Sequence, residues 1–358
     1  MNPILKYIRN IFASQREMGR DAHLSGKEKA DLLLQQLIED KCVPGLAISV
    51  RKNNRVYFQK GYGFANLEQE IPIDPLKTVF RVASVSKPIA ATALATMVAD
   101  RKLDLDASFY NYVPYYPKKE YDFTLRQLAG HTAGIRGYRG AEYGLNLPMG
   151  IRESLSLFQD DALVFKPGTQ YLYSSYDWVL ISLAIEEVSG IPFADYVQEK
   201  VLKRFELVDT FPEIPRENFS NKATFYSRYR LGFRKAIQVD NRFKLAGGGY
   251  LSTSSDVAHF GQAFLDASLG EDPVMSQFLA ATFINGESTY YGLGWQVSED
   301  KMGRPYFGHV GNGIGGYAVF YVYPDEDMVF SILINCTNPR VEEILEEAVS
   351  LLICGKKG

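Results

Sequence analysis

The chain has 358 residues, which is enough for one large domain or two closely packed ones. Hydrophobic residues make up 46% of it and charged residues 23%, an ordinary globular composition that excludes a chain disordered over most of its length. The formal net charge of −3 offers no general basis for binding nucleic acid, so we expect no nucleic-acid partner.

Residues 1–24 are predicted to be a basic N-terminal extension with apolar residues at helical spacing. The extension lacks the continuous apolar core and cleavage site of a secretory signal, and no run in the chain approaches the ~18 apolar residues of a membrane span. We expect a lead helix that packs on the protein. The alternative is a helix in weak contact with a membrane surface. A cytoplasmic location is expected, with the periplasm as the alternative.

Cysteine and histidine spacing gives no sign of a metal site. The three cysteines, Cys42, Cys336 and Cys354, form neither a disulfide framework nor a zinc-binding pattern. The four histidines include no pair at metal-ligand spacing. We therefore expect neither a metal nor another cofactor.

Strand patterns occur near both ends of the chain. Alternating apolar residues predict strands at 44–51, 55–61, 291–298, 305–309, 317–323 and 328–335. A capping box, formed by Ser25 and Glu28, opens a helix whose apolar stripe we expect to pack on a sheet. A second stripe follows Asn338 and Pro339 and predicts a C-terminal helix that starts there.

The middle of the chain is mostly helix and loop, with helices predicted at 124–129, 176–188, 193–204 and 255–265. Together these elements predict an α+β fold, in which an antiparallel sheet from both chain ends is flanked by terminal helices and carries a mainly helical insertion. The expected sheet domain comprises 25–83 and 291–358. The expected helical domain comprises 84–290, with a catalytic cleft between the two.

Basic and aromatic residues alternate in 221–244. This pattern is typical of a nucleic-acid patch, but also of a loop or hairpin beside a substrate cleft. Because the chain has no positive net charge, we favour the hairpin or loop.

The most informative stretch is 80–97, a short strand followed by a helix of small apolar residues that we expect to be buried on all sides. Ser84 and Lys87 stand three residues apart at the start of this helix and therefore share a face. The positive end of the helix dipole favours an alkoxide on the serine and disfavours a protonated lysine. A neutral amine beside a hydroxyl is an activated nucleophile. The same spacing at Ser298 and Lys301 lies in a polar turn, where we expect no function.

Two further stretches carry candidate residues. Tyr173 precedes the predicted helix at 176–188 and could relay a proton if Lys87 lowered its pKa, although in a chain with 23 tyrosines it could equally be a packed aromatic. His309 ends a strand and enters a glycine-rich bend. It could meet a substrate carboxylate, or it could be an ordinary hydrogen-bonded histidine. The glycines of the bend would let a substrate approach the backbone.

In order and approximate spacing, these residues resemble the three motifs of the serine beta-lactamase and penicillin-binding-protein superfamily: Ser84-x-x-Lys87, Tyr173-Ser-Ser175 and His309-x-Gly311. The class C beta-lactamase-like branch is the most similar. Within it, 134–136 and 239–249 are most similar to the beta-lactamase-like serine peptidases of mitochondria and their bacterial relatives. The resemblance covers about 25–350 and implies a beta-lactamase/transpeptidase-like fold.

The resemblance also implies a role for each motif residue. Ser84 would be the acylated nucleophile, and Lys87 and Tyr173 would share its deprotonation and the protonation of the leaving group. Which of the two is the general base stays open. The backbone N–H groups of Ser84 and Asn312 would form the oxyanion hole. The positions expected to face the substrate are Ser175, His309, Gly311 and Asn312.

Ser175 departs from the superfamily, whose second motif usually ends in asparagine. A serine is shorter and has one donor fewer, so it cannot hold a substrate carbonyl and Lys87 together in the same way. This favours peptidase or esterase activity over beta-lactamase activity, which we expect to be weak at most. No Gly-x-Ser-x-Gly nucleophile elbow occurs, which excludes the ordinary esterase fold.

The leading hypothesis is a metal-free serine hydrolase that forms an acyl-enzyme on an amide or ester of a small molecule or peptide. The alternative is a catalytically idle penicillin-recognition or sensor domain, or a self-assembling scaffold. Because an idle site has no need of Ser84, Lys87 and Tyr173 together, we prefer the enzyme. The sequence leaves the oligomeric state open.

Overall fold

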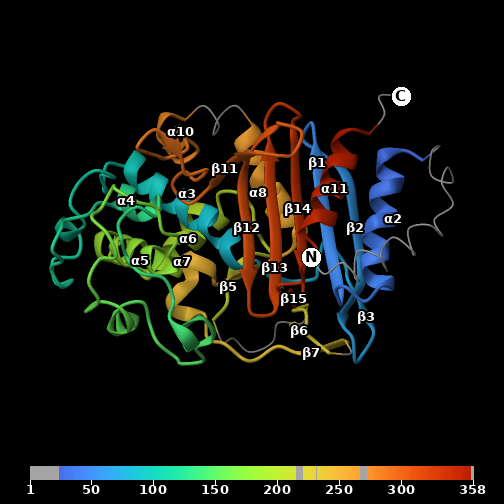
Figure 1. Cartoon of the computed structure of the whole chain (residues 1–358), viewed down its shortest axis with the longest axis horizontal. Helices are drawn as coiled ribbons and strands as arrows, with labels where there is room; N and C mark the ends of the chain where they lie inside the picture. Colours follow the sequence, from blue (N-terminus) through green and yellow to red (C-terminus); the bar gives the residue numbers. More distant parts are fainter. Residues whose placement is uncertain (1–23, 215–220, 231, 267–271, 356–358) are drawn as a thin grey trace, which may run out of the picture. The chain divides into compact units, whose positions relative to one another are not determined.

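The computed structural model describes residues 24–214, 221–230, 232–266 and 272–355 (Figure 1). The chain divides into two compact units, one holding α2 (Gly26–Glu39) and α11 (Glu342–Ile353), the other comprising 41–340. The predicted lead helix of the N-terminal extension falls outside the described residues. Within these ranges, no helix has both the length and the apolar character needed to cross a membrane.

The first unit is a pair of helices in contact with each other. Helix α2 begins with the predicted capping box, in which Ser25 and Glu28 bond each other's backbone N–H groups. The predicted C-terminal helix begins later than expected, at Glu342. Asn338 and Arg340 have φ values of +40° and +58°, which a right-handed helix excludes. The expected packing of α2 on a sheet stays a prediction.

The second unit is built on a seven-stranded antiparallel sheet with the order β11-β12-β13-β14-β1-β2-β3 (Figure 1). Its strands are β1 (Gly45–Lys52), β2 (Arg55–Asn66), β3 (Ile71–Pro72), β11 (Gln296–Glu299), β12 (Pro305–Gly313), β13 (Gly316–Tyr323) and β14 (Met328–Ile334). Strand β1 pairs with β14, so residues from the two ends of the sequence are hydrogen-bonded neighbours. The predicted α+β fold with an antiparallel sheet from both chain ends is confirmed.

One predicted strand is shorter than expected. The pattern at 291–298 yields only β11, because Gly294 adopts a φ of +85° and turns the chain away from an extended path. Tyr291 keeps a single bridge to Gln296. The Tyr291 hydroxyl forms a hydrogen bond with His309 Nε2.

The remaining helices belong to the predicted insertion and gather beside the β11–β12 edge of the sheet, apart from α8, which contacts β1, β13 and β14 (Figure 1). They are α3 (Ser86–Ala99), α4 (Leu125–Ala129), α5 (Ser175–Ser189), α6 (Phe193–Val197), α7 (Leu245–Gly248), α8 (Ser254–Leu265) and α10 (Pro273–Phe278), with 3-10 turns at Ala83–Val85, Phe109–Asn111, Gly140–Gly144, Glu153–Leu157 and Arg242–Lys244. The predicted helix at 193–204 is split, since α6 passes into a π-helical turn at Gln198–Leu202.

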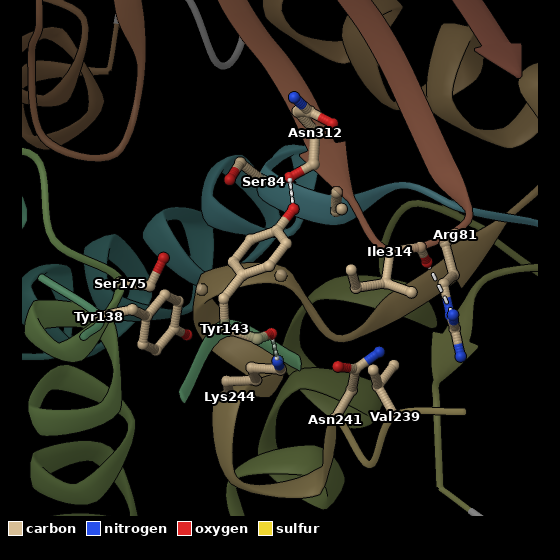
Figure 2. A pocket seen from close by; sticks show the side chains of 14 residues that line it. Arg81, Ser84, Tyr138, Tyr143, Ser175, Val239, Asn241, Lys244, Asn312 and Ile314 are labelled. Atoms are coloured by element: carbon tan, nitrogen blue, oxygen red, sulfur yellow. Dashed lines mark hydrogen bonds between the residues drawn. The ribbon is translucent and has the colours of Figure 1, made fainter. Parts of the chain in front are cut away.

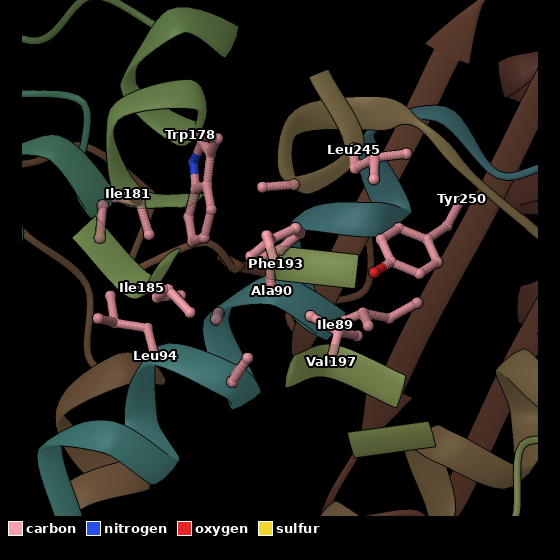
Figure 3. Packing of buried hydrophobic residues seen from close by; sticks show 14 of the residues in the cluster. Ile89, Ala90, Leu94, Trp178, Ile181, Ile185, Phe193, Val197, Leu245 and Tyr250 are labelled. Atoms are coloured by element: carbon pink, nitrogen blue, oxygen red, sulfur yellow. The ribbon is translucent and has the colours of Figure 1, made fainter. Parts of the chain in front are cut away.

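Helix α3 is buried around most of its circumference, as its composition predicts. Ala90, Ala91 and Ala93 are fully buried, and these small side chains let neighbouring helices approach closely. Figure 3 shows residues of α3 facing larger ones from α5 and α6: Ile89, Ala90, Leu94, Trp178, Ile181, Ile185, Phe193 and Val197. This close packing holds the start of α3 in place.

Short strands complete the unit. One small sheet has the order β4 (Phe80–Arg81), β8 (Tyr250–Ser252), β5 (Phe211–Pro212), and another the order β15 (Cys336–Thr337), β6 (Tyr226–Tyr229), β7 (Gly232–Lys235), while β9 (Phe283–Ile284) pairs with β10 (Glu287–Ser288). The antiparallel β6–β7 pair is the hairpin expected within 221–244. The predicted division into a sheet domain and a helical domain stays a prediction.

Candidate active site

Ser84 lies in the 3-10 turn between β4 and α3, one turn ahead of the helix proper. The preceding residue, Ala83, has a φ of +46°, an unfavourable conformation for a residue with a side chain. Strand β12 lies in close contact with this turn. A Cβ at Gly311 would lie 2.2 Å from Val82 O and 3.1 Å from Ser84 N. The glycine therefore lets the chain's own backbone approach, and its expected role beside a substrate stays a prediction.

Lys87 is fully buried on the first turn of α3. Its Nζ lies 3.2 Å from Ser84 Oγ and donates a hydrogen bond to Gly247 O at 2.6 Å. Burial lowers the pKa of the Lys87 amine to about 7, against a smaller opposing effect of the Asp177 carboxylate. A substantial fraction of this amine is therefore uncharged at neutral pH and can accept a proton. The sequence anticipated the neutral amine, but its main cause is desolvation.

Tyr173 brings a third polar atom to the same place. Its hydroxyl donates to Ser84 Oγ at 2.9 Å, and its ring centroid lies 4.7 Å from Lys87 Nζ. Desolvation raises the pKa of Tyr173 well above its ordinary value. From the sequence, a proton relay by Tyr173 depends on a pKa lowered by Lys87, and the structure does not show that lowering. Tyr173 is therefore protonated at neutral pH and donates a hydrogen bond.

Ser174 positions this tyrosine by tying the start of α5 to a neighbouring segment. Its hydroxyl caps the helix by accepting from Tyr176 N and donates to Arg136 O at 2.7 Å. The next residue, Ser175, lines the same pocket as Ser84. Its Cβ would lie 3.3 Å from a Cβ placed at Gly247, so the residue beside it must be small.

His309 is buried on β12 and both of its ring nitrogens are engaged. Nδ1–H donates to Val310 O at 2.7 Å, so Nε2 accepts from the Tyr291 hydroxyl at 2.9 Å. Desolvation lowers the pKa of His309 to about 3, so the ring is neutral at physiological pH. The contact with a substrate carboxylate expected from the sequence would require the ring to release one of these bonds. It stays a prediction.

A pocket with about 460 Å³ of empty space, solvent at its mouth included, opens beside Ser84 (Figure 2). Of the candidates from the sequence, it is lined by Ser84, Ser175 and Asn312. The other lining residues are Arg81, Ala83, Tyr138, Tyr143, Val239, Asn241, Lys244, Gly247, Gly248, Gly313 and Ile314. Tyr143 spans part of the pocket, because its hydroxyl donates to Asn312 O at 3.1 Å and its carbonyl accepts from Lys244 Nζ at 3.0 Å.

Sequence reasoning missed a buried pair behind Tyr173. His131 Nδ1 lies 2.7 Å from Asp177 Oδ2, and the His131 ring centroid is 4.4 Å from that of Tyr173. Burial raises the pKa of the Asp177 carboxyl and lowers that of His131. The sequence signals were an aspartate among the apolar residues of the first turns of α5 and a stretch beginning at His131 that resembles the superfamily, but neither indicated that the two side chains meet.

A sheet of this topology, with a serine, a lysine and a tyrosine meeting where α3 begins, defines the class of serine beta-lactamases and penicillin-binding proteins. A family model described as beta-lactamase matches residues 30–353. The chain belongs to this family.

Three similar proteins illustrate the relationship. The serine beta-lactamase-like protein LACTB, mitochondrial, of Mus musculus is 27% identical, with 82% of this chain and 72% of that protein covered. The D-amino acid amidase of Ochrobactrum anthropi SV3 has a TM-score of 0.80 at 17% identity, covering 90% of this chain and 98% of that one. A D-stereospecific amidohydrolase from Streptomyces sp. has a TM-score of 0.77 at 21% identity, covering 92% and 99%. The predicted superfamily and fold are confirmed.

Proposed function

We propose that this chain is a serine hydrolase that forms an acyl-enzyme on Ser84 and cleaves amide or ester bonds. The observation that carries the proposal is the convergence of Lys87 Nζ, at 3.2 Å, and the Tyr173 hydroxyl, at 2.9 Å, on Ser84 Oγ. Both distances are within hydrogen-bond range or close to it, as proton transfer to or from the nucleophile requires. Amidase and amidohydrolase activities named for two structural neighbours are consistent with it.

The first half of the proposed reaction acylates the enzyme. Uncharged Lys87 takes the proton of Ser84 as Oγ attacks the substrate carbonyl. Tyr173 keeps its proton and donates a hydrogen bond to Oγ until the leaving group needs one. The backbone N–H groups of Ser84 and Asn312 would stabilise the oxyanion. Collapse of the tetrahedral intermediate expels the leaving group, which takes a proton either directly from Lys87 or from Tyr173, which then recovers one from Lys87; in both cases Lys87 is left uncharged.

The second half releases the product. A water molecule attacks the acyl carbonyl and Lys87 accepts its proton. The bond between the carbonyl carbon and Ser84 Oγ then breaks, and Oγ takes the proton back from Lys87, which regenerates Ser84. Because Ser175 offers one donor fewer than the asparagine usual in the second motif, we prefer peptidase or esterase activity to beta-lactamase activity. The proposed substrate is a small molecule or peptide, and a cytoplasmic location stays a prediction.

Intact mass spectrometry tests the acyl-enzyme directly. The protein is incubated with a fluorophosphonate, nitrocefin, p-nitrophenyl esters and small peptides, in parallel with the Ser84→Ala variant. We expect adducts on Ser84 that are absent from the variant, whose melting temperature should be nearly unchanged. An idle recognition domain or scaffold would take no label. Nitrocefin turnover far above that of the esters and peptides would reverse our ordering of activities.

A further inference from the structure

A second buried lysine lines the pocket that contains the nucleophile. Lys244 is 8% exposed, yet its side chain belongs to the pocket wall (Figure 2). It ends the 3-10 turn Arg242–Lys244, directly before α7, whose Gly247 carbonyl holds Lys87. The chain therefore carries Lys244 to the pocket on the same short segment that contacts the proposed base.

The ammonium group of Lys244 makes fewer hydrogen bonds than its three N–H donors allow. Its Nζ donates to Tyr143 O at 3.0 Å, and this is its one hydrogen bond among the residues that the structure describes. A protonated lysine has three N–H donors. The rings of Tyr138 and Phe243 lie 5.6 and 5.5 Å from Nζ and offer only weak cation–π contact. Two donors are left for another acceptor.

The nearby carboxylates are committed elsewhere. Glu213 accepts two hydrogen bonds from Arg81, at 2.7 and 2.9 Å, one from Lys222 at 3.0 Å and one from Asn241 at 2.7 Å. These four donors occupy the lone pairs of both carboxylate oxygens. Asp240 is held by Arg242. Neither acid is an ion-pair partner of Lys244.

Two other side chains near the nucleophile, Arg81 and His309, are not available to bind a carboxylate as Lys244 is. Arg81 is paired with Glu213 and also donates to Ile314 O at 2.7 Å. The histidine from which the sequence predicted carboxylate recognition, His309, is neutral and has both nitrogens engaged. Among the pocket-lining residues, Lys244 is thus the cation with donors to spare.

We propose that Lys244 binds a carboxylate of the substrate, so that acyl donors bearing a carboxylate are preferred over neutral ones of the same length. Asn241, Tyr138 and Tyr143 surround the position where this group would lie. The inference rests on the proposed function, since it names the substrate class of the same site. A charge-assisted hydrogen bond in a buried pocket is among the stronger polar contacts that a protein makes.

The charge state of Lys244 is consistent with this role. Burial and, to a smaller extent, Arg81 lower its pKa, Glu213 and Asp240 raise it, and the net value is about 8. The group is therefore mostly protonated at pH 7. Burial disfavours the charged ammonium form of Lys244. A bound carboxylate would favour that form, so the lysine and the anion would stabilise each other.

Ester turnover tests the preference. Two p-nitrophenyl esters with acyl chains of equal length are compared, one ending in a carboxylate and the other in a carboxamide. The native protein should favour the carboxylate ester. In Lys244→Met the ratio of the two kcat/KM values should fall by about 10- to 100-fold, the loss expected for one buried charge-assisted bond. Lys244→Gln, which keeps a donor for Tyr143 O, provides a second variant without the charge.

Lys235→Met is the matched control, because Lys235 is 64% exposed on β7 and does not line the pocket. This variant should retain the native ratio. An equal ratio in the native protein and both Lys244 variants would overturn the inference, as would a native protein without preference. Normal turnover of the neutral ester by a Lys244 variant would show that the variant is folded.

Calorimetry with glutarate separates this inference from the proposed function. In Ser84→Ala protein, glutarate should bind at least about 10-fold more tightly than glutaramide, and Lys244→Met should abolish the difference. If glutarate binding depends on Lys244 but the native protein takes no adduct on Ser84, the proposed function is wrong and this inference stands. If Ser84 is acylated but glutarate binding does not depend on Lys244, the proposed function stands and this inference is wrong.

Discussion

Lys87 and Arg81 lie on one short stretch of chain and both are buried, but only Arg81 has a carboxylate partner that stabilises its charge. Lys87 Nζ faces a hydroxyl and a carbonyl oxygen, and burial lowers its pKa to about 7. Arg81 donates two hydrogen bonds to Glu213. The pKa of Glu213 is lowered despite its burial, because Arg81 and Lys222 stabilise the carboxylate.

The difference separates two uses of a buried cation. A buried amine without a carboxylate partner can lose its proton, which is what a general base requires. A buried guanidinium with a bidentate partner stays charged and holds backbone segments together. Lys244 lies between these cases, with a pKa of about 8 and one hydrogen bond. The pocket beside Ser84 thus contains a structural charge, Arg81, and a candidate anion-binding group, Lys244, while the candidate base is buried next to the nucleophile.

Replacing Lys87 with methionine should have the largest effect. We expect turnover of a neutral ester to fall on the order of 10³-fold or more, since the proposed base is lost. The same change should stabilise the fold by on the order of 2–4 kcal/mol below pH 7, because a buried cation is removed. Kinetics and chemical denaturation measure the two effects.

The sign of the stability effect follows from linkage. Between pH 7 and pH 10.5 the unfolded chain holds the Lys87 proton more tightly than the folded one, so the native protein gains stability as the pH rises. The advantage of Lys87→Met should therefore shrink across this range. A variant that is less stable than the native protein at pH 6 would contradict the description of Lys87 as a strained buried amine.

Breaking the Arg81–Glu213 ion pair should lower the stability of the fold. Glu213→Gln leaves Arg81 buried without a counter-charge, and we expect a loss of about 3–5 kcal/mol in the free energy of unfolding. The control is Asp106→Asn, which breaks a bidentate but exposed pair with Arg126 and should cost less than about 1 kcal/mol. Urea denaturation at pH 7 measures both. Equal losses would show that burial does not distinguish the pairs.

The native Glu213 interaction should also depend on pH. Since its folded pKa is lowered, the stabilisation is present above the unfolded value and is lost as the pH falls through the folded one. Glu213→Gln should lack this part of the acid sensitivity.

The smallest expected effect concerns the pH profile. The kcat/KM of a neutral ester should rise with pH through about 7, as Lys87 loses its proton. Asp177 raises the Lys87 pKa, so Asp177→Asn should move this rise to lower pH, by less than about one unit because desolvation is the larger influence on the Lys87 pKa. His131→Gln, on the other side of the His131–Asp177 pair, provides the companion measurement. A displacement to higher pH would rule out this electrostatic contribution of Asp177.

Local features were the most predictable from the sequence. Ser84 and Lys87 meet because three residues separate them at a helix start, and Ser25 forms its capping box with Glu28 for the same kind of local reason. The alternating pattern of 317–323 predicted the fully buried β13 almost to its ends. The errors fell where backbone conformation departs from the pattern, at Gly294 and at Asn338 with Arg340.

By itself, the sequence determined the family, the antiparallel sheet from both chain ends and the motif that brings an amine to a hydroxyl, since these depend on short-range order and side-chain periodicity. Only the tertiary structure decided which buried groups are charged. The Tyr291 hydroxyl forms a hydrogen bond with His309 Nε2, Glu213 forms an ion pair with Arg81, and Lys244 has donors to spare beside the pocket. These partners are distant in sequence, and the pKa of each group depends on the desolvation and hydrogen bonds that folding creates.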